Sequence, residues 1–369
     1  MKKFIALIIF LSLLTSCGKK KENIKEEPKQ DIVEKEDNKK EEPKKEEPKK
    51  EEPKKEEPKV PPKKEEHPKT PPKKEPPKKE IPKKDLNELG YTKENLDTLN
   101  KLVSKNSLDV LLKTQTPSNI AMSLINETYY IDEYLNKYIN YRNKKPNLSP
   151  AIIIRDVNCH LDVPFYTQTE KTDTSLGKFV MLNKHYTADS SYPSSGIISV
   201  PGKYHIKNAS IKLNKECYEA FLKMYQDALD AGYGFRLKSG YRSYQVQKDT
   251  YNYWVRQEKG NYRVADTYSA RAGSSEHQTG YAFDIRDYNY QYEDYSKSKS
   301  FKWVSQNCYK YGFIIRFPKG KENITGYQYE SWHYRYVGKE AATYIHNHNL
   351  TFEEYYEYFI RFKNPRNLK

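Results

Sequence analysis

Two histidines and one aspartate in the second half of the chain have side chains that can hold a zinc ion. His277 and Asp284 belong to the segment SSEHQTGYAFD, and His333 ends the segment ESWH. Two imidazoles and a carboxylate supply three ligands and leave a fourth position for water. A plain strand would place His277 and Asp284 on opposite faces, so the pair needs a bend, which Gly280 offers. The alternative is that His277 caps a loop and that His333 is a half-buried strand residue.

Glu330 lies three residues before His333, where a carboxylate can accept a proton. Zinc lowers the pKa of its bound water toward ~7, so hydroxide becomes available near neutral pH. A carboxylate beside that water can take its proton and return it to a leaving amine. These residue types therefore indicate hydrolysis with a metal ion and a general base.

The segment SGYRSYQVQ contains Arg242, whose planar guanidinium suits a carboxylate such as the free C-terminus of a peptide. The alternative is an ordinary surface arginine, which is common in a chain with 65 Lys and Arg. The sequence has neither a GxSxG elbow nor a Gly-rich phosphate loop, which argues against a serine hydrolase.

The elements that must position these residues alternate between helices and short strands. Apolar residues recur at helical spacing between residues 86 and 146, and an amphipathic helix is predicted from Lys215 to Ala231, just before Gly232. Further helices are predicted at 244–257, 301–311, 339–347 and 351–361, and strands at 151–154, 235–237, 283–285, 313–317 and 332–337. This mixture predicts an α+β fold, in which a small mixed or antiparallel sheet with flanking helices holds the zinc site.

Composition divides the 369 residues into a part that can fold and a part that cannot. The chain is 36% hydrophobic and 31% charged, with a net charge of +15. Residues 19–85 contain 24 Lys, 20 Asp or Glu and 13 Pro, many of them in an EEPKK repeat. Such a segment buries too little apolar surface to fold, so residues 18–85 are predicted to be a disordered, extended tether. Its nearly balanced charge argues against nucleic acid as a partner.

The first 17 residues are typical of an export signal. Lys2 and Lys3 precede an apolar run at 4–14, and the letters LTSC follow. This ending looks like a bacterial lipobox, which predicts lipidation of Cys17 and attachment to the outer face of the cell membrane, with the tether reaching into the cell wall. An ordinary secretory signal is the alternative. No apolar run reaches the ~20 residues of a membrane-spanning helix.

From about residue 237 to 354 the sequence resembles the zinc-dependent D-alanyl-D-alanine carboxypeptidases of the VanY type and the related L,D-carboxypeptidases. The similar segments are SGYRSY–Q, SSEHQTGYAFDI and YGFIIRFPKGKENITGYQYESWHYRYVG, with weaker similarity in LGYTKENLD and MLNKHY. The resemblance implies one zinc ion bound by His277, Asp284 and His333, with Glu330 as the general base. It also implies that the terminal residue of the substrate is contacted by Arg242, Gln247 and Ser275.

This resemblance implies an enzyme that removes the terminal D-Ala from peptidoglycan stem peptides, and the lipobox-like segment adds the expectation of a lipid anchor. The expected divisions are a signal peptide at 1–17, a tether at 18–85, a helical module at 86–150 and a carboxypeptidase domain at 151–369, with its core at about 205–350. The first alternative is an L,D-carboxypeptidase acting on tetrapeptide stems, and the second is a catalytically idle wall-binding lipoprotein. Residues 86–369 carry 39 Lys or Arg against 30 Asp or Glu, so anionic wall polymers are a further expected partner. Outside the signal segment the cysteines are odd in number, and no disulfide is predicted: Cys159, Cys217 and Cys308.

Overall fold

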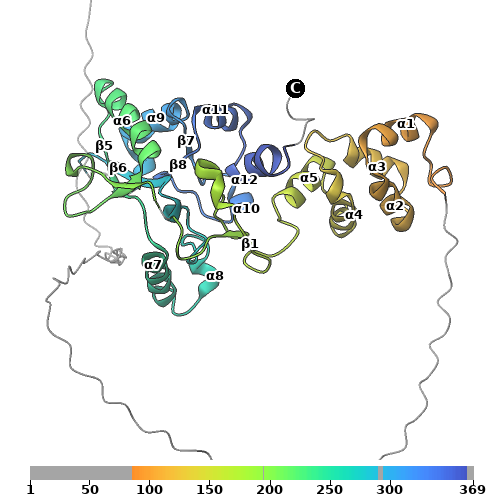
Figure 1. The fold of residues 1–369 in the computed structure, drawn as a ribbon, viewed down its shortest axis with the longest axis horizontal. Helices are drawn as coiled ribbons and strands as arrows, with labels where there is room; N and C mark the ends of the chain where they lie inside the picture. The colour runs from red at the N-terminus through yellow and green to blue at the C-terminus, as the bar shows by residue number, and fades with distance from the viewer. Residues whose placement is uncertain (1–84, 194, 290–293, 364–369) are drawn as a thin grey trace, which may run out of the picture. The chain divides into compact units, whose positions relative to one another are not determined.

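The computed structural model describes residues 85–193, 195–289 and 294–363 (Figure 1). The predicted signal segment with Cys17 and the tether up to residue 84 lie outside the described residues. Among the residues that are described, no helix combines the length and the apolar character needed to cross a membrane.

The first described segment is a module of helices around its own apolar core. Its helices are α1 (Lys93–Leu102), α2 (Lys105–Thr114), α3 (Ser118–Ile125), α4 (Leu135–Lys144) and α5 (Pro150–Asn158). Leu99, Leu111, Leu124 and Tyr138 are buried in this core. The helical character predicted for 86–146 is confirmed.

The strand predicted at 151–154 is wrong, because these residues belong to α5. Ser149 caps the helix by accepting a hydrogen bond from a backbone N–H of the first turn, and Pro150 is its first residue. Ile153 and Val157 are buried in the core of the helical module. The module therefore extends past the boundary that was predicted at residue 150.

The following residues form an α+β domain around a four-stranded antiparallel sheet, which confirms the predicted fold class. The strands are β5 (Phe235–Ser239), β6 (Ala282–Asp287), β7 (Phe313–Ile315) and β8 (His333–Tyr336). They lie in the order β5-β6-β8-β7. Phe235, Phe283 and Phe313 of the sheet pack in one apolar core with Phe221 of α6 (Lys215–Asp230) and Val304 of α9 (Lys299–Asn307).

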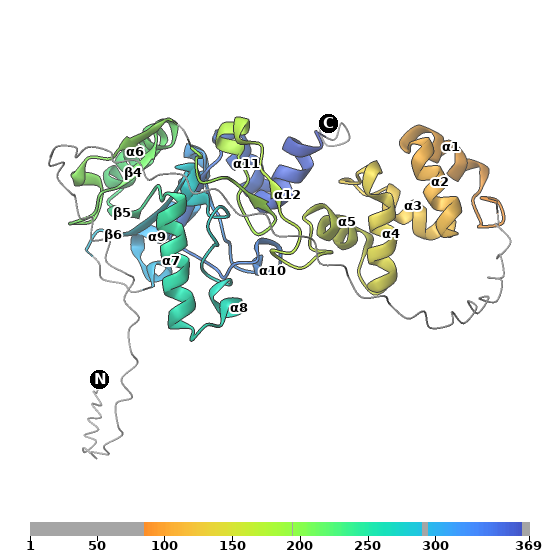
Figure 2. The same ribbon diagram turned by 60° about the horizontal axis from the view of Figure 1, so that its bottom comes forward.

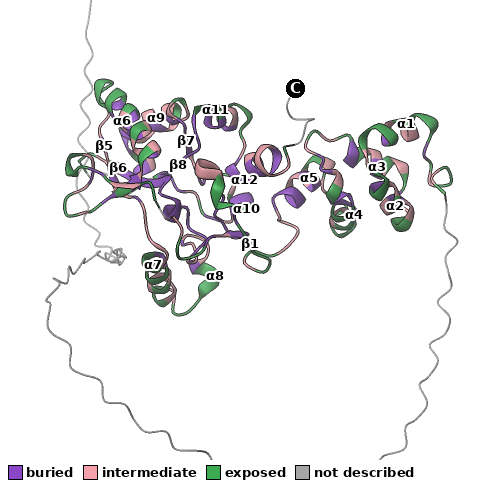
Figure 3. Cartoon of the chain, viewed as in Figure 1, coloured by how far each residue is buried: buried purple, intermediate pink, exposed green. Residues whose placement is uncertain are grey.

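Short strand pairs and further helices complete this domain. β1 (Glu170–Lys171) pairs in parallel with β2 (Tyr186–Thr187), and β3 (Ile197–Ser199) pairs antiparallel with β4 (Lys212–Asn214). The helices are α7 (Tyr244–Gln257), α8 (Tyr262–Ala265), α10 (Glu322–Thr325), α11 (Lys339–His348) and α12 (Phe352–Tyr355), and a π-helical turn follows at Tyr356–Arg361. Helices α7 and α8 lie side by side at one edge of the domain (Figure 2). Much of their surface is exposed, whereas the strands of the sheet are mostly buried (Figure 3).

A left-handed glycine directs the chain from the segment of His277 into β6. Gly280 has a φ of +72°, and a Cβ at this position would overlap Cδ1 of Ile197 and lie 3.1 Å from the backbone nitrogen of Asn214. The space is closed because the N–H of Asn214 donates to the carbonyl oxygen of Gly280 at 2.9 Å. The bend expected at Gly280 is therefore present, and both its backbone angle and its surroundings require glycine.

Replacing Gly280 with Ala should destabilise the domain more than replacing Gly232 with Ala. Gly232 has a similar φ of +84°, but no heavy atom of the described residues lies within 4 Å of where its Cβ would be. G232A should therefore cost only the backbone strain, about 1 kcal/mol. G280A also displaces the terminal carbon of Ile197 and crowds the backbone nitrogen of Asn214, and we expect a total loss of about 2–3 kcal/mol. Urea unfolding of both variants measures the difference, and equal losses would show that packing does not constrain this turn.

Candidate metal centre

His277 lies in a short 3-10 turn, Glu276–Thr279, directly before Gly280. Its Nδ1 lies 2.7 Å from the carbonyl oxygen of Gly240. Because a carbonyl oxygen only accepts hydrogen bonds, Nδ1 carries the proton and Nε2 keeps its lone pair. Nε2 is buried 3.5 Å from Oδ2 of Asp284 and has no hydrogen-bond partner in the described part of the chain. The backbone thus presents His277 in the form that binds a metal.

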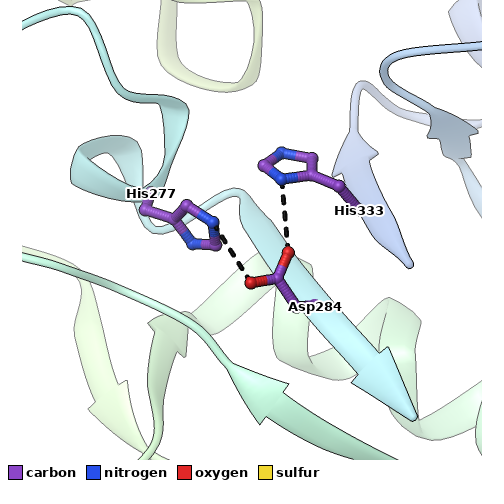
Figure 4. A group of neighbouring side chains, drawn as sticks. All are labelled: His277, Asp284 and His333. Atoms are coloured by element: carbon purple, nitrogen blue, oxygen red, sulfur yellow. Dashed lines mark ion pairs between the residues drawn. The ribbon is translucent and has the colours of Figure 1, made fainter. Parts of the chain in front are cut away.

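Asp284 and His333 face each other across two neighbouring antiparallel strands. They are register partners in β6 and β8, so their side chains lie on the same face of the sheet. Oδ1 of Asp284 lies 3.2 Å from Nδ1 of His333, while Oδ2 faces His277 (Figure 4). The two imidazole rings stand edge to face, with centroids 4.9 Å apart. The carboxylate therefore reaches both histidines at once.

The three side chains fit a metal ion. One ligand atom from each residue lies within 4.8 Å of the other two. Ligand atoms about 2.1 Å from a tetrahedral zinc ion are about 3.4 Å from one another. Each histidine lies at nearly that distance from one oxygen of the shared carboxylate, His277 at 3.5 Å from Oδ2 and His333 at 3.2 Å from Oδ1. In addition, Nε2 of His277 and Oδ1 of Asp284 have no hydrogen-bond partner among the described residues, which suits atoms directed at a ligand.

Glu330 reaches the same site from the loop before β8. Its backbone N–H donates to the carbonyl oxygen of Phe317 at 3.1 Å, and its Oε2 lies 3.5 Å from Nδ1 of His333. The side chain is largely buried. A carboxylate in this position can exchange a proton with a water molecule next to the ligand set.

The three residues expected to bind substrate differ in how they contact the turn that contains His277. The backbone N–H of Arg242 donates to the carbonyl oxygen of His277 at 3.1 Å, and Ser275 is the residue at which the 3-10 turn begins. Gln247 is buried in α7, and its side-chain amide donates to the carbonyl oxygen of Ala270 at 2.7 Å. Arg242 and Ser275 thus adjoin the metal ligands, whereas the amide of Gln247 holds the loop that leads to Ser275. Their roles toward a substrate stay predictions.

A buried cluster of charges behind the site was missed by the sequence analysis. It consists of Glu276, Arg316, Arg335 and Glu353. These residues come from four separate segments, and no spacing in the sequence shows that they meet. The one available signal was position, because Glu276 precedes His277 and Arg335 follows His333 by two residues.

The three ligand side chains differ in protonation near neutral pH. Burial lowers the pKa of His277 to about 3, and the charge of Arg242 adds to this effect, so the ring is neutral. Burial would also lower the pKa of His333, but Asp284 and Glu276 raise it to about 9. Burial would raise the pKa of Asp284, but His277 and His333 hold it well below its usual range. His333 is therefore the ligand that must release a proton when a metal binds.

Zinc binding to the metal-free protein should become tighter as the pH rises, because zinc displaces the proton of His333. That proton has a pKa of about 9. We therefore expect the dissociation constant to fall about tenfold per pH unit from about pH 6.5 to about pH 8.5, and to level off above about pH 9. Competition with a chromophoric chelator, corrected for the chelator's own protonation, measures this profile.

The matched control is His346→Gln, because His346 is exposed on α11 and lies outside the ligand set. This variant should keep the wild-type profile. A dissociation constant that does not change over the same pH range would contradict the protonation assigned to His333.

Comparison with known proteins identifies the family of this chain. Residues 210–339, which include the three ligand residues, Glu330 and the residues expected to bind substrate, match the family model described as VanY: D-alanyl-D-alanine carboxypeptidase. The chain is 42% identical over 182 residues to the YodJ protein of Bacillus subtilis (strain 168), an alignment that covers 48% of this chain and 66% of that protein. It is 34% identical over 131 residues to the bifunctional D-Ala-D-Ala dipeptidase and D-Ala-D-Ala carboxypeptidase VanXYC of Enterococcus gallinarum, covering 34% of this chain and 68% of that protein. The chain belongs to the VanY family.

Among solved structures, the chain is similar to that of the LdcB LD-carboxypeptidase. The sequence identity is 39%, the alignment covers 52% of this chain and 90% of that one, and the TM-score is 0.48. The chain spans 61% to 68% of the length of four curated relatives that it matches, about two thirds at most.

Proposed function

We propose that this protein is a zinc-dependent D-alanyl-D-alanine carboxypeptidase that removes the terminal D-Ala from peptidoglycan stem peptides. The observation that carries the proposal is the buried set His277, Asp284 and His333 with Glu330 beside it, inside the segment that matches the family model. Three ligands and an adjacent carboxylate suit a hydrolase, since a protein that only binds needs neither an open metal position nor a base. One zinc ion per chain is expected at this set.

The chain's own groups account for the proton transfers of such a hydrolysis. When bound, zinc supplies Lewis acidity toward water and toward the scissile carbonyl. Oε2 of Glu330 accepts a proton from the attacking water as the new carbon–oxygen bond forms. The same oxygen gives this proton to the nitrogen of the departing D-Ala as the carbon–nitrogen bond breaks. The balance is one water consumed and one free amine and one carboxyl group produced.

Arg242 provides the reason to propose release of a terminal residue rather than cleavage within a chain. Its backbone N–H is hydrogen-bonded to the carbonyl oxygen of His277, and the positive charge of its side chain helps to lower the pKa of that ring. A guanidinium there can pair with the free carboxylate of the terminal D-Ala. Ser275, at the start of the same turn, is a second proposed contact, and Gln247 a third.

The first alternative is an L,D-carboxypeptidase that takes the last D-residue from a tetrapeptide stem. Both bonds release D-Ala, and they differ in the residue that precedes it. The test is to measure the zinc content of the full-length protein and to follow D-Ala release from pentapeptide and tetrapeptide stems by mass spectrometry. One zinc per chain with chelator-sensitive release from the pentapeptide supports the proposal, and release from the tetrapeptide alone supports the alternative. Zinc-free protein that is inactive on both would favour a wall-binding protein without catalysis.

Replacing Glu330 with Ala should lower D-Ala release about 10²- to 10⁴-fold, because the water and the leaving amine lose their proton carrier. The zinc content should stay at one ion per chain, since Glu330 is outside the ligand set. Steady-state rates and metal analysis on the same sample measure both quantities.

Glu322→Gln is the matched control, because Glu322 is an exposed carboxylate at the start of α10. It should leave the rate and the zinc content unchanged. Full activity in the Glu330→Ala protein would remove the proposed base.

A further inference from the structure

A cluster of two arginines and two glutamates is buried directly behind the metal ligands. The exposed fractions are 4% for Glu276, 1% for Arg316, 0% for Arg335 and 4% for Glu353. Arg316 donates through Nε to Glu276 at 2.7 Å and through its two terminal nitrogens to Glu353 at 2.8 and 2.6 Å. The two arginines and two glutamates carry equal and opposite charge, so the cluster as a whole has no net charge to bury.

The two oxygens of Glu276 have different surroundings. Oε1 accepts the bond from Arg316 and lies 3.0 Å from Nη1 of Arg335. Oε2 is buried and lies 3.8 Å from Nε2 of His333, which is also buried, and neither atom has a hydrogen-bond partner among the residues that the structure describes. A carboxylate held by two guanidinium groups is ionised, and an ionised carboxylate only accepts. At 3.8 Å the two facing atoms attract each other only if Nε2 of His333 carries a proton, because a lone pair on Nε2 would face the negative carboxylate.

The other nitrogen of this ring faces the metal site. Nδ1 of His333 lies 3.2 Å from Asp284 and 3.5 Å from Glu330. A histidine nitrogen binds a metal only through a free lone pair, and the hydrogen bond at the second nitrogen decides which one is free. A proton held on Nε2 therefore leaves Nδ1 as the ligand.

We propose that Glu276 is a positioning residue that holds His333 with its proton on Nε2 and so directs Nδ1 at the metal, while Arg316 and Arg335 fix the carboxylate. The inference rests on the proposed function and adds a residue to its machinery. The two histidines are thus oriented by different kinds of acceptor group. His277 uses the backbone carbonyl of Gly240, and His333 uses the side chain of the residue that precedes His277.

The sheet and the turn place these groups together. His333 and Arg335 are two residues apart on β8, so their side chains lie on one face of the strand. Glu276 and His277 are neighbours in the 3-10 turn. A single turn therefore contributes one metal ligand and orients another.

The test compares Glu276→Gln with Glu353→Gln. Each change removes one negative charge from the same cluster at nearly constant volume, but the carboxylate of Glu353 contacts Arg316 and Asn183 and not a metal ligand. In E276Q the two arginines attract the amide oxygen, so the NH₂ group turns toward Nε2 of His333. A donor at that position favours the opposite tautomer.

The first measurement is the zinc dissociation constant of the chelator-treated full-length proteins. We expect E276Q to weaken zinc binding about 10- to 100-fold and E353Q to weaken it less than about threefold. The second is the NMR signal of the Nε2 proton of His333 in zinc-loaded protein with ¹⁵N-labelled histidine. This signal should be protected from exchange in the wild type and in E353Q, and broadened or lost in E276Q.

Wild-type zinc affinity in a folded E276Q protein would overturn the proposal, as would an equal loss in E276Q and E353Q. If E276Q fails to fold, Glu276→Asp decides, because it keeps the charge beside the arginines and withdraws the carboxylate from His333. Unchanged zinc affinity in folded E276D would also overturn the proposal. The wild-type protein distinguishes this outcome from a failure of the proposed function. If the proposed function is wrong, the wild-type protein itself binds no zinc or releases no D-Ala.

Discussion

The pairing of Asp284 with His333 across β6 and β8 is the constraint on which the site depends. Backbone hydrogen bonds of the ladder hold both residues on one face of the sheet, so their side chains need little further ordering to meet. On the other side of β6, Ser239 of β5 is also a partner of Asp284, and the next residue, Gly240, accepts the hydrogen bond that orients His277. Three strands of one sheet thus determine the positions of three ligands.

The charged side chains of the site are buried, and they do not form a complete set of ion pairs with one another. Asp284 and Glu276 lie at opposite nitrogens of His333 and, together with Glu330, raise the pKa of that ring although burial alone would lower it. The carboxylates that retain a proton on His333 in the metal-free protein also favour a metal cation in place of that proton. Ionised groups away from water are costly unless they are matched, and the arginines behind the site provide that match for Glu276.

Local patterns predicted the regular elements well where the pattern and the end signals agreed. The helices predicted at 215–231 and 244–257 match α6 and α7 closely, because a polar capping residue precedes each, and α6 also buries a periodic apolar face. The run at 151–154 has three isoleucines, which favour a strand, but Ser149 and Pro150 start a helix there. Packing of this apolar face in the helical module overrides the weak strand preference of β-branched residues.

The sequence by itself determined the chemical types at the site, since two imidazoles, two carboxylates and a guanidinium lie in short recognisable segments. Which nitrogen of each histidine faces the metal position, and which residues meet behind it, were decided only by the tertiary structure. Glu276 and Arg316 are 40 residues apart, and the side-chain amide of Gln247 donates to the carbonyl oxygen of Ala270, 23 residues away. The physical reason is that strand register and burial create these contacts, whereas spacing along the chain reports only neighbours within a turn or a strand.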